Sequence, residues 1–204
     1  MAVPVVTQLI KSGAIVYQAP VAEGIPAITT VTYGTAWGGN WVRLGYTKAP
    51  LAVSYESDEL DLEVEEVLAA IGRVRVGEKL SVETTLAELT DTYLQVAAAE
   101  AMAITTVAAG VGTAGYERTG LGGTSTLAMH AWGVEGRYVD SAGSNLPIRL
   151  YIWKATGHLN GKLEFSWKTK EYTGIPLQIL ALADPTQATG EQLVRIDRVT
   201  AAAT

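Results

Sequence analysis

The sequence contains no cysteine, which excludes disulfide bridges, thiolate metal ligands and cysteine nucleophiles. Such a composition is typical of a protein assembled in a reducing cytoplasm. Histidine occurs only as His130 and His158, which lie in different predicted segments, so a shared metal site would need carboxylate ligands from elsewhere in the fold. We therefore expect no thiol chemistry, no metal and no other cofactor.

Positive charge is also scarce, with 15 Lys and Arg against 21 Asp and Glu and a net charge of −6. Nucleic-acid backbones are bound mainly through Lys and Arg, so we do not expect nucleic acid as a specific ligand. No run of apolar residues is long enough for a membrane span. The opening Met1-Ala2-Val3-Pro4 lacks the basic start of a signal peptide, and we expect none.

The most distinctive segment is acidic. Between Tyr55 and Glu66 the chain carries seven carboxylates and no basic residue. Acids alternate there with aliphatic residues, and this period of two predicts a strand from about Leu51 to Val67. The strand would place acids on one face and aliphatic residues, able to pack, on the other. The acidic face consists of Glu59, Asp61, Glu63 and Glu65.

A row of like charges must be solvated or compensated. One interpretation is a solvated sheet face, and another is a surface that repels a passing polyanion; a weak Ca²⁺ or Mg²⁺ site among these carboxylates is a third. Past Gly72 a second alternating segment carries Arg73 and Arg75. The two segments can pair as a long hairpin, which would bring these arginines close to the acids.

One helix is predicted at about residues 85–99. Thr85 and Glu88 have the spacing of a capping box, and Leu86, Leu89 and Tyr93 follow at helical spacing, with Leu89 on the buried face. The segment from about 100 to 123 is rich in Gly, Ala and Thr, and we interpret it as a loop or mobile segment.

The remaining segments are predicted to be strands, one within Val3–Tyr17 and others at about 126–139, 146–155, 161–172 and 176–182. This order predicts an α+β fold that is mainly β, an antiparallel β-sandwich or barrel with one flanking helix. A length of 204 residues fits a single domain, residues 1–204, with a long hairpin or arm.

No motif supports an enzyme. The chain has no Gly-x-Ser-x-Gly elbow, and its clustered glycines lack the Lys of a phosphate loop, so no catalytic residue is assigned. The five tryptophans are interpreted as core or subunit-interface residues in preference to a carbohydrate platform. Apolar residues with glycine make up roughly 54% of the chain against a usual 45–50%, which favours extra surface buried between subunits.

The order of several short motifs resembles a known family. The motifs are Trp41-Val42-Arg43-Leu44-Gly45-Tyr46-Thr47, Val53-Ser54-Tyr55-Glu56, Leu60-Asp61-Leu62-Glu63-Val64, Gly77-Glu78-Lys79, Leu86-Ala87-Glu88-Leu89, Ile175-Pro176-Leu177 and Ala181-Leu182-Ala183-Asp184. Across about residues 38–184 this pattern resembles the tail tube, or major tail, proteins of long non-contractile-tailed bacteriophages.

The resemblance implies a structural virion protein of the phage tail, present in the host cytoplasm during assembly. It implies rings of six subunits that share a continuous inner β-barrel and stack into a tube for genome delivery, with an arm bridging to the next ring. The partners it implies are further copies of the chain and the tape measure, tail terminator and tail tip proteins. DNA would pass through without specific binding.

Within this interpretation the acidic row is assigned to the bore or to an inter-ring junction. Trp41, Arg73 and Arg75 are assigned to subunit contacts. An acidic bore would avoid retaining DNA, because a handful of Lys or Arg contacts already gives about micromolar binding. The alternatives are another virion assembly protein, the tube of a contractile-tail-like particle, and a β-sandwich carbohydrate-binding module or hydrolase.

Overall fold

The computed structural model describes residues 9–28, 33–64, 67–88, 90–98, 104–120, 123, 125–139, 145–162 and 174–200. The elements are β1 (Leu9–Pro20), β2 (Val42–Arg43), β3 (Ala52–Val64), β4 (Val67–Leu86), α1 (Asp91–Ala97), β5 (Thr105–Val107), β6 (Tyr116–Arg118), β7 (His130–Val139), β8 (Asn145–Leu159), β9 (Ile175–Ala181) and β10 (Arg195–Arg198).

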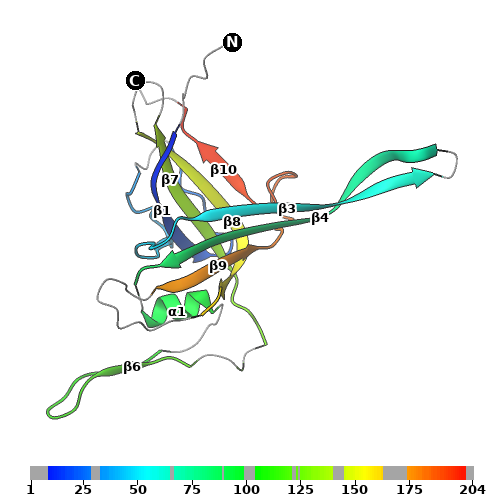
Figure 1. The fold of residues 1–204 in the computed structure, drawn as a ribbon. Helices are drawn as coiled ribbons and strands as arrows, with labels where there is room; N and C mark the ends of the chain where they lie inside the picture. Colours follow the sequence, from blue (N-terminus) through cyan, green and yellow to red (C-terminus); the bar gives the residue numbers. More distant parts are fainter. Residues whose placement is uncertain are drawn as a thin grey trace.

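Most strands belong to one antiparallel sheet with the order β2-β1-β7-β8-β9-β4-β3. β8 is long enough to serve two partners along one edge, since its first half pairs with β10 and its second half with β9. The sheet curls, so that β4 and β3 cross in front of β7 and β8 (Figure 1). The prediction of a mainly β, antiparallel fold with one flanking helix is confirmed for the described residues.

The main core lies inside this curl. Alternation along each strand brings apolar side chains to a common side, where Trp132 of β7 and Ile152 of β8 are fully buried. The members of this core include Val16, Leu44, Leu80, Val82, Leu86, Ala97, Ala155, Ile175, Leu177 and Ile179. Helix α1 covers this region against β8 and β9. A Cβ at Gly157 would lie only 2.3 Å from the Val96 carbonyl oxygen, so glycine is what lets the helix approach β8.

A second core covers the opposite face of β1, β7 and β8. Trp37 stacks on Tyr17, with ring centroids 4.3 Å apart, and contacts the rings of Trp41 and Tyr151. Trp37 lies directly over Gly133, where a Cβ would come within 2.2 Å of the indole. We call the connection between β1 and β2, residues 21–41, the strap. Its aromatic residues give this part of the sheet a buried face on both sides.

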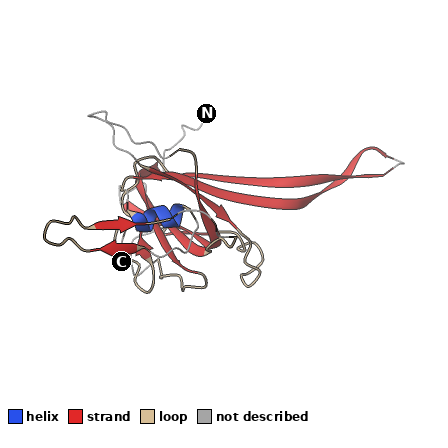
Figure 2. Ribbon diagram, turned by 90° about the horizontal axis from the view of Figure 1, so that it is seen from below, coloured by secondary structure: helices blue, strands red, loops and turns tan. Residues whose placement is uncertain are grey.

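The long hairpin is confirmed. β3 and β4 pair along most of their length, and the acidic segment faces the segment of Arg73 and Arg75 as predicted. The distal half of the hairpin extends far beyond the rest of the subunit (Figures 1 and 2). We call residues 59–75 the arm.

The predicted helix boundaries are wrong. Thr85 and Leu86 belong to β4, where they pair with Pro176 and Ile175 of β9, so the proposed capping box does not exist. The helix begins after Thr90, whose hydroxyl accepts a hydrogen bond from the Tyr93 amide. The tertiary pairing with β9 extends β4 through residues whose local pattern favours a helix. Leu89 lies outside the described residues.

The loop predicted at about 100–123 is also wrong in part. β5 and β6 form a two-stranded hairpin there, with Thr105 opposite Arg118 and Val107 opposite Tyr116. This hairpin and the arm project from opposite sides of the body (Figures 1 and 2). Short β10 was not predicted, and the predicted strand at 161–172 lies almost wholly outside the described residues. Mobility of the 100–123 segment stays a prediction.

Candidate functional site: the arm and the groove at its base

The arm leaves the body where β3 and β4 still contribute to the core. Val53 lies opposite Val82, and Tyr55 lies opposite Leu80. Directly opposed residues of an antiparallel pair share a face of the ribbon, and both β4 residues are buried in the main core. We call this face the core side of the ribbon.

The character of the core side changes along β3. Because side chains alternate, Tyr55, Ser57, Glu59 and Asp61 all lie on the core side. This side is therefore apolar next to the body and acidic beyond Ser57. The opposite side is polar next to the body and becomes aliphatic from Leu60 onward.

A β-bulge on β4 accompanies this change. The pairs Asp58–Gly77 and Glu59–Arg75 are adjacent on β3, but on β4 they are separated by Val76, which has no partner.

The bulge matches side chains of the same kind across the arm. In a ladder without the extra residue, Leu60 would lie opposite Arg75. In the structure Leu60 lies opposite Val74, and Asp61 lies opposite Arg73. The arm consequently has one charged face (Glu59, Asp61, Arg73 and Arg75) and one apolar face (Leu60, Leu62 and Val74).

The charged face contains ion pairs of mixed sign. Arg73 Nε donates to Asp61 Oδ1 at 2.6 Å, and Arg73 Nη1 lies 3.4 Å from Glu59 Oε2. The hydrogen bond to Asp61 raises the pKa of Arg73. Arg75 pairs instead with Glu78, at 2.5 Å between Nη1 and Oε1. Arg73 thus compensates Glu59 and Asp61 of the acidic row within the same subunit, whereas Arg75 pairs with an acid outside the row, and these exposed pairs add little to stability.

Glu78 also joins the arm to its base. The Tyr55 hydroxyl donates to Glu78 Oε1 at 2.8 Å. The hydrogen bonds from Tyr55 and Arg75 lower the pKa of the Glu78 carboxyl group. The three side chains therefore bridge the bulge on the core side.

The apolar face of the arm is exposed in the subunit. The exposed fractions are 55% for Leu60, 42% for Leu62 and 48% for Val74. The aliphatic side was expected to pack, but within the subunit these three residues do not. Aliphatic side chains gathered on one side of a ribbon are typical of a contact surface.

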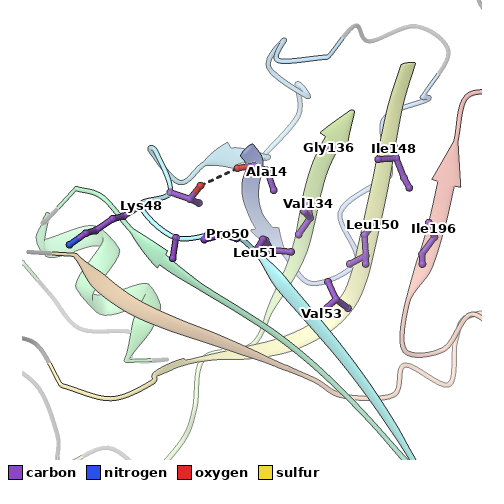
Figure 3. A pocket seen from close by; sticks show the side chains of 12 residues that line it. Ala14, Lys48, Pro50, Leu51, Val53, Val134, Gly136, Ile148, Leu150 and Ile196 are labelled. Carbon is purple, nitrogen blue, oxygen red and sulfur yellow. Dashed lines mark hydrogen bonds between the residues drawn. The ribbon is translucent and has the colours of Figure 1, made fainter. Parts of the chain in front are cut away.

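An apolar groove of about 550 Å³ lies at the base of the arm. Val53 of β3, Val134 of β7, Ile148 and Leu150 of β8 and Ile196 of β10 converge on it (Figure 3). The Lys48 amine points away from this space (Figure 3). The groove therefore has the chemistry of a seat for aliphatic side chains and offers little to a charged ligand.

Unpaired strand edges flank the groove. Within the described part of the chain, β3 pairs only with β4, and β10 pairs only with β8. Free edges present backbone donors and acceptors to further strands. Groove and edges together form an open end of the sheet.

The other predicted site residues have separate locations. Glu63 lies on β3 and is exposed, and Glu65 lies outside the described residues. Trp41 is only 9% exposed and donates from Nε1 to the Gly24 carbonyl oxygen at 2.9 Å. Its role as a subunit contact stays a prediction. Only the small exposed part of the side chain could make such a contact. Arg73 and Arg75 are exposed on the arm.

A buried ion pair was missed by the sequence analysis. Arg149 and Glu135 are opposite each other on β8 and β7, and both side chains are fully buried. Arg149 Nη2 lies 2.9 Å from Glu135 Oε1, and the guanidinium lies under the Trp37 ring at 5.1 Å. Glu135 Oε2 accepts a hydrogen bond from the Gly34 amide at 2.9 Å, which attaches the strap to β7. The signal in the sequence was an acid, Glu135, and a base, Arg149, each within a largely apolar strand.

The two histidines do not form a metal centre in the part of the chain that the structure describes, where no group of three His, Asp or Glu side chains could hold an ion. His130 has a pKa lowered by burial, and His158 Nε2 lies 2.8 Å from the Thr156 hydroxyl. Among the described helices, none is long and apolar enough to cross a membrane.

No family model and no curated protein matches this chain. The features that bear on function are the arm, the groove and the sequence motifs. What these features can do chemically is to bury aliphatic surface against another protein.

Proposed function

We propose that the chain is a structural subunit of a phage tail tube, which assembles into stacked rings of six and forms the conduit for genome delivery. The tail tube fold, a virion location and the absence of an enzymatic role belong to this proposal. The motif order over residues 38–184 supports it through family resemblance. The mainly β, curled antiparallel sheet with one flanking helix is compatible with it.

The observation that carries the proposal is the arm. A two-stranded ribbon that leaves the body and exposes aliphatic side chains gains little stability by itself in water. Burial between subunits would remove this apolar surface from water and stabilise the ribbon. A self-assembling protein can use such an arm to bury its apolar surface against another copy.

Three of the five tryptophans give no support to the carbohydrate-binding alternative. Trp37, Trp41 and Trp132 are buried in the two cores, so these rings have no free faces for sugars. The other virion proteins and the tube of a contractile-tail-like particle remain alternatives, because they too would use an arm for assembly.

Within the proposed tube, the charge pattern of the arm favours a junction between rings over the bore. Arg73 compensates Glu59 and Asp61 in the same subunit, so this face is not uniformly acidic. DNA passes through without specific binding, and the tape measure, tail terminator and tail tip proteins are the expected partners by family resemblance.

Removal of the arm tests the proposal. The variant replaces residues 59–76 by Asn-Gly, a turn that suits a two-residue hairpin between Asp58 and Gly77. We expect the wild type to form rings or tubes at high protein concentration, and the armless variant to remain a folded monomer. Sedimentation velocity and negative-stain microscopy measure assembly, while circular dichroism checks the fold. A wild type that stays monomeric to about millimolar concentration would contradict the proposal.

A further inference from the structure

We propose that the arm contacts a second copy of the chain through its apolar face, Leu60, Leu62 and Val74, which docks in the groove at the base of that copy. This inference rests on the proposed self-assembly and adds which face of the arm makes the contact and where it binds. The charged face of the arm is then left on the outside of the contact.

The register excludes the arm's own subunit as the partner. Near the body the core side carries Tyr55, but the apolar residues of the arm lie on the opposite side of the ribbon. Leu60 is also seven residues beyond Val53 at the groove, roughly 23 Å along an extended strand. Two apolar surfaces of one chain therefore cannot meet within that chain.

Two copies of the chain can bring the apolar face of one arm into contact with the groove of the other copy. The groove is lined by aliphatic side chains from β3, β7, β8 and β10, and its rim residue Ile196 is 60% exposed. The arm carries its aliphatic side chains away from its own body, where a neighbouring copy can contact them (Figures 1 and 2). A contact between two different surfaces of identical chains is head-to-tail, and repetition of such a contact gives rings or filaments.

Two variants show whether assembly depends on the side of the ribbon on which the apolar residues lie or on the bend that the bulge produces. Deletion of Val76 removes the bulge and leaves Leu60 and Val74 on the side opposite the core. Insertion of one serine between Asp58 and Glu59 gives Val76 a partner and also removes the bulge, but it moves the apolar residues to the core side. Both variants keep the cross-strand pairs of the arm, including the pairing of Leu60 with Val74.

We expect the Val76 deletion to assemble as the wild type does. We expect the serine insertion to raise the protein concentration needed for assembly by at least about tenfold, because the aliphatic contact is lost. Loss of assembly in both variants, in neither, or in the deletion alone would overturn the inference while leaving the proposed function intact. A wild type that does not assemble would overturn both.

Disulfide trapping tests the docking site even where an arm variant fails to fold. The chain has no cysteine, so introduced thiols are the only ones. Leu60→Cys protein is mixed with Ile196→Cys protein and oxidised, and Glu59→Cys on the charged face replaces Leu60→Cys in the matched control. We expect a cross-linked heterodimer with Leu60→Cys, at least several times more abundant than with Glu59→Cys. Equal yields, or none from Leu60→Cys, would overturn the docking site.

Discussion

At the scale of single residues, the Glu135–Arg149 pair distinguishes the two sides of β7 and β8. Burying an ion pair costs desolvation energy. Removal of one partner destabilises the protein more than replacement of both partners by apolar residues, because it leaves the other charge buried and unpaired. Glu135 also accepts the Gly34 amide, so it connects the strap to the sheet. The pair therefore specifies where the strap docks.

Glu135→Gln should lower the free energy of unfolding by about 3–5 kcal/mol, because Arg149 keeps its charge and loses the buried carboxylate. The double variant Glu135→Leu with Arg149→Met should recover a large part of this loss. Urea denaturation followed by tryptophan fluorescence measures both. A single variant within about 0.5 kcal/mol of the wild type would show that the pair contributes nothing.

Tyr17 predicts a pH dependence at the alkaline end. Burial, followed by the nearby Glu135 carboxylate, raises the pKa of Tyr17 to about 12, against about 10 in the unfolded chain. The folded state thus favours the protonated phenol, whose hydroxyl donates to the Thr35 carbonyl oxygen. This contribution is complete below pH of about 10 and is lost as the pH rises from about 10 to 12. Tyr17→Phe should show a smaller fall in stability over that interval, and an unchanged slope would contradict the assignment.

At the scale of elements, helix α1 depends on a cap and on a close fit to the sheet. Its seven residues would be only marginally stable alone, so packing on β8 and β9 maintains it. The Thr90 hydroxyl caps its start by accepting a hydrogen bond from the Tyr93 amide.

Thr90→Ala should therefore cost about 1 kcal/mol through loss of the cap. Thr92→Ala, two residues further on and exposed, is the matched control and should leave stability unchanged or slightly raised, since alanine favours helix. Thermal or urea unfolding measures both variants. If the two changes had the same effect, Thr90 would not be the functional cap.

At the scale of the whole molecule, the arm and the groove leave apolar surface exposed on the single subunit. The two hairpins project from opposite sides of the body, and both present side chains to solvent. A single subunit leaves these surfaces in water, whereas an assembly can bury them.

The two proposed locations of the acidic row, the bore and the junction between rings, predict different effects of the same substitutions. At the junction, Asp61→Asn with Glu63→Gln should shorten tubes, and high salt should weaken wild-type stacking, because charge pairs are screened. In the bore, the same neutral variant should leave tubes intact, while Lys at both positions should slow DNA ejection in a salt-dependent way. Tube length and ejection rate at two salt concentrations distinguish these cases. If the Lys variant gave normal tubes and unchanged ejection, the acidic row would have neither role and would be a solvated sheet face.

The amino-acid sequence by itself determined the strands of the arm. The alternation around Asp61 and Arg73 has a period of two, and this local pattern fixes both the strand and the face of each side chain. The hairpin also followed from the sequence, because the two segments alternate with the same period and lie close together in the chain. β7, β8 and β9 were predicted within a few residues for the same reason.

Tertiary structure alone decided the rest. Thr85 and Leu86 have a pattern that favours a helix, but hydrogen bonding to β9 makes them part of a strand. Glu135 and Arg149 look like surface charges until the strap covers them. The bulge at Val76 depends on the partner strand, and the groove depends on strands from β1 to β10 that meet only in the folded chain. Local periodicity carries no information about which distant segment will supply a partner, so these features arise only when the sheet closes.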